Sequence, residues 1–294
     1  MNGFLLVDKA SGMTSHDVVA KVRRRFGTKK VGHAGTLDPM ATGVLVIGIG
    51  NATRLLQYVV DGSKGYEATI ALGKSTLTDD VEGAVLTIAP LTAMSAVTDS
   101  AIYEALEAMV GKIMQRPSSV SAIKVDGKTG HARVRSGEEF EFPAREVQIA
   151  SIEIHSIVRS ELAINLEISV RCSAGTYIRA IARDLGESLG VGGHLTSLRR
   201  TFVSPFGVGE CQNWEVAELI STAAGISRIL PTRELAPAEV VEISFGRSIA
   251  ANHLDGPVAA LINGENFVAL LENRILGEKV VATPTLVSMK ESAV

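Results

Sequence analysis

The sequence predicts an α+β fold, in which a mixed, largely antiparallel sheet is flanked by helices and followed by a small C-terminal β domain. Two neighbouring segments, 145–158 and 161–172, alternate between apolar and polar residues, as half-buried antiparallel strands do. Apolar residues recur at helical spacing after Thr14, near Ile102 and after Thr176. Beyond residue 230, short apolar runs flank the turn residues 263–266 and predict a β hairpin.

The composition argues against a membrane-spanning, secreted or metal-binding protein. A hydrophobic share of 46% in 294 residues is enough for a real core, and no stretch of about 18 apolar residues could span a membrane. The apolar N-terminal run lacks a preceding positive charge, so it predicts a first strand and not a signal peptide. Cys172 and Cys211 show no metal-binding spacing. We therefore expect reduced thiols, a cytoplasmic location and no metal site.

The first predicted helix has clear ends. Thr14 and Asp17 have the spacing of a capping box, and Gly27 can end the helix. Its apolar face is formed by Val18, Val19, Val22 and Phe26.

Positive charge is concentrated at the end of this helix. Residues 21–30 hold six cations and no anions, whereas the whole chain has a net charge of −3. Such a run most often forms a solvated helix face, but its place before the loop described next favours contacts with nucleic-acid phosphates. The predicted phosphate contacts are Arg23, Arg24, Lys29 and Lys30.

Segment 32–43 is the most informative stretch. Its three glycines and one proline predict an irregular loop, and the apolar run 44–49 predicts a buried strand that anchors it. Asp38 precedes Pro39, which restricts its backbone to extended or turn geometry. Taken alone, Asp-Pro indicates a turn, but a carboxylate on a stiffened loop is also well placed to meet a ligand.

The middle of the chain alternates between regular and polar segments. Residues 66–72 predict a strand with Tyr66 on its apolar face, and 78–83 form an acidic turn without a third ligand for a metal. Apolar spacing then predicts a helix that runs from about Ile102 to a stop at Gly111. Segment 115–143 is long, polar and basic in places, which is typical of a functional or disordered insertion.

The second alternating strand, with Leu162 at its start on the apolar face, leads into a third helix. Thr176 is its predicted cap, and its apolar positions are Ile178, Ile181, Ala182 and Leu185. Tyr177 and Arg179 lie in its first turn. Because the helix dipole disfavours a cation there, Arg179 should have a specific anionic partner.

Taken together, these segments resemble the TruB family of tRNA pseudouridine synthases. Segment 32–43 resembles the family signature G-H-x-G-x-L-D-P, and 175–186 resembles G-T-Y-I-R-x-L-x-x-D-L-G. Segment 8–15 resembles K-P-x-G-x-T-S, with Ala10 in place of the proline. Further similar segments are 64–73, 78–83, 117–127 and 192–201. The resemblance is strong over roughly the first three quarters of the chain and weak beyond.

The resemblance implies a pseudouridine-synthase fold with a catalytic domain over 1–230 and a PUA-like domain over 231–294. It implies isomerisation of uridine 55 in the T loop of tRNA, by a monomer that needs no cofactor and no guide RNA. The insertion 115–143 would close over the RNA, with Lys124 among its RNA contacts. His131 stands where the family often has a tyrosine.

It also implies roles for individual residues. Asp38 would be the catalytic nucleophile, kept ionised by Arg179 because an adjacent cation favours the charged form. Tyr66 would lie under the base and would be one of the catalytic residues. Tyr177, Leu198 and His33 would contact the uridine, which must be flipped out of the RNA before reaction.

Two alternatives stay open. One is a guide-RNA-dependent synthase acting on another RNA, which the self-contained insertion and the lack of a long basic tail disfavour. The other is a non-catalytic RNA chaperone on the same fold, which the presence of Asp38, Tyr66 and Arg179 disfavours.

Overall fold

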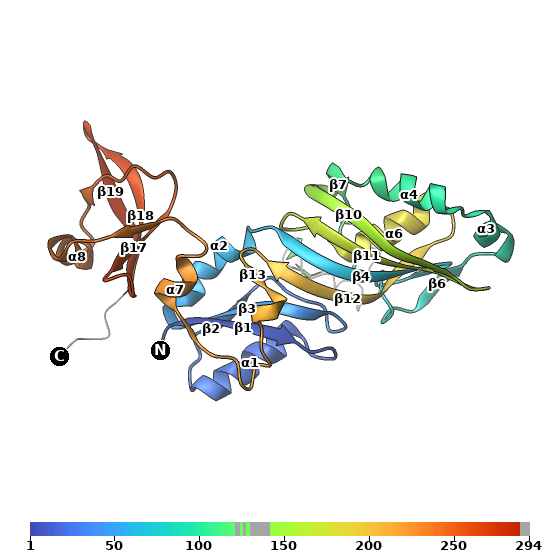
Figure 1. The fold of residues 1–294 in the computed structure, drawn as a ribbon, viewed down its shortest axis with the longest axis horizontal. Helices are drawn as coiled ribbons and strands as arrows, with labels where there is room; N and C mark the ends of the chain where they lie inside the picture. Colours follow the sequence, from blue (N-terminus) through green and yellow to red (C-terminus); the bar gives the residue numbers. More distant parts are fainter. Residues whose placement is uncertain (121–123, 126–127, 130–141, 289–294) are drawn as a thin grey trace.

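The computed structural model describes the chain except residues 121–123, 126–127, 130–141 and 289–294, and gives only the backbone of 124–125 and 128–129. A ten-stranded sheet runs along the molecule, and a five-stranded sheet forms a separate lobe at the C-terminal end (Figure 1). The predicted fold class is thus confirmed.

The large sheet is mixed but mainly antiparallel; among its named strands only β3 and β12 pair in parallel within the described residues. In spatial order, its main path contains β14 (Ile220–Ser221), β1 (Gly3–Lys9), β3 (Thr42–Ile49), β12 (Gly193–Val203), β4 (Lys64–Leu72), β11 (Ile164–Cys172), β10 (Arg145–Arg159) and β7 (Gly111–Gln115). Off this path, β2 (Val31–Ala34) pairs with β3, and β13 (Phe206–Gly207) pairs with β12.

Helices and short elements accompany the two sheets. The helices are α1 (Ser15–Phe26), α2 (Leu56–Val60), α3 (Leu91–Ala96), α4 (Asp99–Glu107), α6 (Ile178–Ser188), α7 (Thr222–Ile226) and α8 (Pro237–Ser244), with 3-10 helices η1 (Gly50–Leu55) and η2 (Val208–Glu210). Two small hairpins pair β5 (Lys74–Thr76) with β6 (Val85–Ile88), and β8 (Lys124–Val125) with β9 (Lys128–Thr129). No helix in the described part of the chain is both long and apolar enough to cross a membrane.

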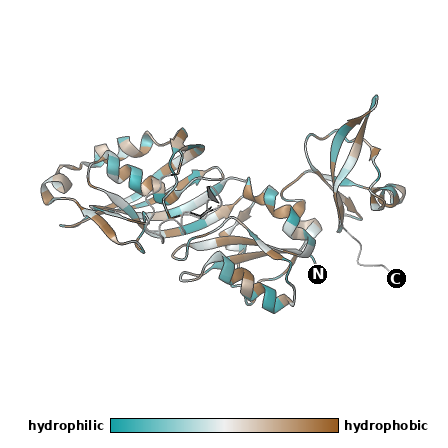
Figure 2. Ribbon diagram, turned by 180° about the vertical axis from the view of Figure 1, so that it is seen from behind, coloured by the Kyte–Doolittle hydropathy of each residue, from teal (hydrophilic) through white to brown (hydrophobic). Residues whose placement is uncertain are grey.

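The core explains the two kinds of strand pattern. Helices α4 and α6 cover β4, β10, β11 and β12 through the largest apolar cluster. At β1 and β3, one face packs on α1 and the other on α2 and η1. Burial on both faces is why 44–49 is continuously apolar, while β11 alternates. Figure 2 shows polar and apolar residues side by side along the outer helices, as expected for helices with one buried face.

Helix α1 forms as predicted. The Thr14 side chain accepts from the backbone of Asp17, whose carboxylate accepts in return from the Thr14 backbone, and Gly27 ends the helix in the left-handed conformation. Val18, Val19 and Val22 are buried.

The predicted loop 32–43 is shorter than expected. Residues 31–34 form β2, paired with β3, and β3 already begins at Thr42. Backbone pairing with a buried strand overrides the local preference of Gly32 for irregular structure. Gly43 has a φ of +99° and lies so close to the Arg200 backbone that a Cβ would clash. A glycine at this position therefore allows β3 to pair with β12.

Three further details differ from the predictions. Thr176 is not the cap of α6; the cap is Tyr177, and the Thr176 hydroxyl donates to the Ser173 carbonyl. Helix α4 ends at Glu107, before Gly111, because Gly111 is already paired in β7. Leu162 is 64% exposed in a turn closed between Ser160 and Ala163, so β11 begins only at Ile164.

The C-terminal sheet contains, in order, β15 (Thr232–Glu234), β17 (Val258–Ile262), β18 (Asn266–Leu276), β19 (Lys279–Val287) and β16 (Ile249–Ala250). The predicted hairpin is β17–β18. Around α8 this sheet has an apolar cluster of its own. Ala259 and Leu270 also join the cluster of the large sheet.

Candidate active site

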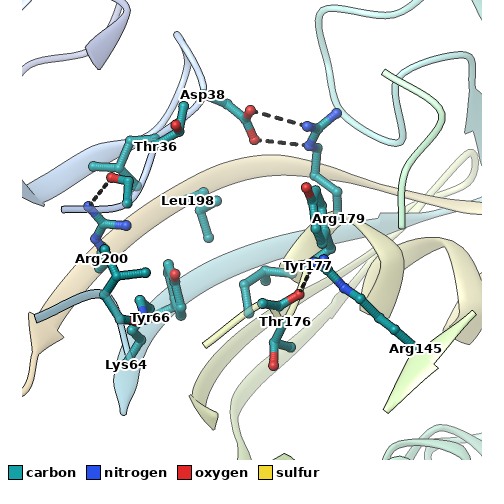
Figure 3. Close-up of a pocket in the computed structure, with 15 residues that line it drawn as sticks. Thr36, Asp38, Lys64, Tyr66, Arg145, Thr176, Tyr177, Arg179, Leu198 and Arg200 are labelled. Carbon is teal, nitrogen blue, oxygen red and sulfur yellow. Dashed lines mark hydrogen bonds and ion pairs between the residues drawn. The ribbon is translucent and has the colours of Figure 1, made fainter. Parts of the chain in front are cut away.

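A pocket of about 340 Å³ lies where the Asp38 loop, β4, β12 and the start of α6 meet (Figure 3). Its lining includes a carboxylate, several cations and apolar and aromatic walls. The lining residues are Gly35, Thr36, Leu37, Asp38, Val60, Lys64, Tyr66, Arg145, Gly175, Thr176, Tyr177, Ile178, Arg179, Leu198 and Arg200. Five predicted site residues, Asp38, Tyr66, Tyr177, Arg179 and Leu198, are thus brought together.

The loop that carries Asp38 is held through its backbone. The Leu37 amide donates to the Ser15 hydroxyl and the Leu37 carbonyl accepts from it. On the other side, the Pro39 carbonyl accepts from the Gly12 amide and from the Lys9 ammonium at 3.2 Å. Burial lowers the pKa of Lys9 to about 8. These contacts fix the backbone on both sides of Asp38 and leave its carboxylate open to the pocket.

Arg179 has the anionic partner that the sequence predicted, and this partner is Asp38. Its Nη2 donates to Asp38 Oδ1 at 3.1 Å, and its Nε lies 2.9 Å from Oδ2. The Nε hydrogen is not well directed at that oxygen, so one hydrogen bond and one short charge contact hold the pair. Figure 3 shows the two side chains facing each other. The arginine is 5% exposed and the carboxylate 28%.

Arg179 has further partners that sequence reasoning missed. Its Nη1 donates to the Thr78 carbonyl at 2.7 Å and lies 3.4 Å from Asp80 Oδ2, and its Nη2 also donates to the Val120 carbonyl at 3.0 Å. Asp80 lies in the loop between β5 and β6, as predicted, but its side chain is only 4% exposed. A buried guanidinium needs hydrogen-bond acceptors and a balancing negative charge. These partners accept from Nη1 and Nη2 and supply the charge.

The pocket wall opposite Asp38 is apolar and aromatic. Tyr66 on β4 and Leu198 on β12 are both buried, and their two strands pair directly with each other. Burial raises the pKa of Tyr66, so its phenol stays protonated. Buried aromatic and apolar side chains of this kind can stack against a nucleobase.

Three pocket cations were not predicted as site residues. Arg200 is buried, with its Nε donating to the Val44 carbonyl at 2.8 Å and its Nη2 to Gly35 at 3.1 Å. Lys64 donates to the carbonyls of Val60 and Gly62, and burial lowers its pKa to about 8. Arg145 lies over the Tyr177 ring. Lys64 and Arg200 lie within the similar segments 64–73 and 192–201, and Arg145 directly follows the basic insertion 115–143, which were the sequence signals for these residues.

Comparisons with known proteins show which family the chain belongs to. A model of the TruB family pseudouridylate synthase N-terminal domain matches residues 23–178, and one of the tRNA pseudouridylate synthase B C-terminal domain matches 179–233. The tRNA pseudouridine synthase B of Arthrobacter sp. (strain FB24) is 50% identical over 286 residues, covering 92% of each chain. That of Corynebacterium aurimucosum is 49% identical over 278 residues, covering 93% of each.

The chain belongs to the TruB family of tRNA pseudouridine synthases, which are isomerases. Solved structures show the same fold at lower identity. One described as an H/ACA RNP bound to a substrate RNA containing 2'-deoxyuridine has a TM-score of 0.70 at 22% identity, and covers 98% of this chain and 85% of that one.

His33 lies beside the TruB pocket and not in its lining. It sits on β2, with its ring 5.4 Å from that of His16 in an edge-on contact. Burial, together with the nearby charges of His16 and Arg200, lowers the pKa of His33. A role of this side chain against the uridine stays a prediction. Lys124 and His131 cannot be placed, because their side chains lie outside the described residues.

No group of three His, Cys, Asp or Glu side chains with metal-site geometry occurs in the described parts of this TruB protein.

The basic run at the end of α1 divides into two sets. Arg25 donates to the carbonyls of Trp214 and Ala217, and Lys21 lies over the Trp214 ring, so these two serve packing. Arg23, Arg24, Lys29 and Lys30 are exposed, although Arg23 also donates to the Val31 carbonyl. The second set is the one predicted to contact phosphates.

Neutralising this second set should weaken tRNA binding and flatten its salt dependence. Each lost phosphate contact lowers the slope of log K against log salt by about one unit, because fewer counterions are released. Lys29→Gln with Lys30→Gln should therefore reduce the slope by about two. Filter binding from low to high salt measures it. Arg159→Gln, at the end of β10 remote from Arg145 of the pocket, is the matched control; an unchanged slope in the double variant would restore the solvated-face reading.

Proposed function

We propose that this TruB-family chain converts uridine 55 in the T loop of tRNA to pseudouridine, with Asp38 as the nucleophile and without a guide RNA. The observation that carries the proposal is the position of Asp38. Its carboxylate lines the pocket. Arg179 binds this carboxylate, and hydrogen bonds of the Leu37 and Pro39 backbone fix the loop on either side of it.

The reaction asks for few chemical groups. The bond between uracil N1 and the ribose breaks, a bond from C5 to the same carbon forms, the C5 proton leaves and N1 gains a proton. No electron acceptor is needed. A carboxylate can attack or stabilise the reacting centre, and a closed pocket can hold the uracil while it turns. Tyr66, Leu198 and Tyr177 would supply its walls.

The charge of the pocket also suits RNA. Arg179, Arg200, Lys64 and Arg145 line it together with the carboxylate of Asp38, so positive groups exceed negative ones. The phosphates on either side of a flipped nucleotide would meet these cations. We place this chemistry in a catalytic domain over residues 1–230 with the insertion 115–143 contacting RNA, and assign 231–294 to a small accessory domain.

The test is turnover on an unmodified tRNA transcript with tritium at uracil C5, without any other RNA. Because the C5 proton is replaced, product formation releases tritium to water. We expect release of about one tritium per tRNA from the wild-type transcript, and one equivalent less when uridine 55 is replaced by cytidine.

Each other outcome contradicts the proposal in a distinct way. Equal release from both transcripts would place the reaction at another uridine. Release that appears only after a second RNA is added would indicate a guide-dependent synthase. Binding and refolding of tRNA with no release would indicate a chaperone.

A further inference from the structure

A second arginine on α6 repeats the contacts of Arg179 one helical turn later. Nη1 of Arg183 lies 3.4 Å from Asp79 Oδ2, and its Nη2 donates to the Arg116 carbonyl at 2.7 Å. Its Nε donates to the neighbouring Asp184 at 2.8 Å. The side chains of Arg183 and Asp79 are each only 12% exposed. The family motif named above leaves the position of Arg183 open.

The two arginines bind the same two segments. Arg179 reaches Asp80 of the acidic turn and the carbonyl of Val120, and Arg183 reaches Asp79 of that turn and the carbonyl of Arg116. Residues at i and i+4 of a helix lie on one face, so α6 holds the acidic turn and segment 115–120 against each other at two levels.

Other residues of segment 115–120 are tied to the same place. The Gln115 amide nitrogen donates to the Tyr177 carbonyl at 3.0 Å, and its oxygen accepts from the Tyr177 amide at 2.8 Å. Ser118 is fully buried. Burial raises the pKa of Asp79, and the Ser118 hydroxyl and the charge of Arg183 oppose that shift. The segment thus contacts the start of α6 at each end, and Arg183 binds its Arg116 carbonyl in between.

We propose that Arg183 and Asp79 are positioning residues for the reaction. They fix segment 115–120, so that its Val120 carbonyl holds Nη2 of Arg179, the nitrogen that donates to Asp38. Losing the pair would release the segment at Arg116, and Nη2 of Arg179 would lose its second acceptor. The inference rests on the role proposed for Asp38 and Arg179. A purely structural ion pair would stabilise the fold without affecting their geometry.

The test compares Arg183→Gln, Asp79→Asn and the double variant. We expect each single change to lower kcat about tenfold, because small misplacement of a reacting group costs this much or more, with tRNA affinity within threefold. The double variant should be no more than threefold below either single variant, because both remove one unit. Asp79→Asn keeps the volume of the buried side chain and is the variant least disturbing to folding.

A second readout does not depend on turnover. Amide hydrogen exchange in the free protein should become faster in peptides covering 77–80 and 115–120 for Arg183→Gln, because Arg183 joins these two segments, and stay unchanged in β18. Arg228→Gln is the matched control, because Arg228 also joins a carboxylate, Glu210, to a backbone carbonyl, that of Pro205, outside the pocket lining. It should leave both kcat and the exchange of these two peptides unchanged.

Two results would overturn the inference. One is a lower melting temperature for Arg183→Gln with wild-type kcat well below that temperature, which assigns the pair to folding alone. The other is unchanged exchange in 115–120. If the wild type itself shows no turnover on tRNA, the proposed function fails, and the exchange result alone then decides whether Arg183 fixes segment 115–120.

Discussion

Asp38→Asn should abolish pseudouridine formation while tRNA binding stays within several-fold of the wild type. The amide has nearly the same shape but no negative charge, and its nitrogen is a poor nucleophile. Removing a residue that reacts directly costs at least about a thousandfold in kcat. The loop should keep its conformation, because Ser15, Gly12 and Lys9 bind its backbone and not the Asp38 side chain.

Tritium release in single-turnover conditions measures the loss, and filter binding measures affinity. Asp99→Asn is a suitable control, since Asp99 is an exposed carboxylate that also pairs with an arginine, Arg159. Substantial turnover by Asp38→Asn would show that this carboxylate is not the nucleophile.

Arg179→Lys should lower kcat far more than tRNA affinity. A lysine keeps the charge, but its single nitrogen cannot reach Asp38, Asp80 and the carbonyls of Thr78 and Val120 together, as the three guanidinium nitrogens do. We expect a loss of about a hundredfold or more, the size of effect that misplacing a reacting group by about 1 Å produces. A near wild-type rate would instead make Arg179 an RNA phosphate contact.

Arg179→Met should be more damaging and should change the pH dependence. Asp38 and the buried Asp80 would both lose the cation that they contact, so a proton would bind there more readily. Because the ionised carboxylate is the reactive form, residual activity should rise with pH over a range where the wild type is flat. Rates of the two proteins from about pH 5 to pH 9 test this; parallel profiles would exclude the effect.

Local features could be predicted from the sequence because local patterns encode them. The capping box at Thr14, the alternation in β10 and β11, and the turn within β17–β18 each depend on neighbouring residues, and each is present in the structure. The charge argument for Arg179 also held, since a cation in the first turn of a helix is unfavourable unless an anion lies beside it.

Where local preference and pairing compete, the sequence alone was insufficient. Gly32 favours a loop, yet β2 forms because β3 supplies hydrogen-bond partners. Thr176 is a good capping residue, yet Gln115, 62 positions earlier, takes the Tyr177 amide. Both choices depend on backbone groups that meet only after folding.

The sequence by itself determined which chemical groups the protein has and which loop carries Asp38. The tertiary structure decided which groups surround that carboxylate. Arg179 reaches Thr78 across 101 positions of the chain, and Arg200 reaches Gly35 across 165. Such contacts leave no periodic trace in sequence, because the acceptors of a buried guanidinium are those that lie close to it in the folded interior, where most buried N–H groups have a partner.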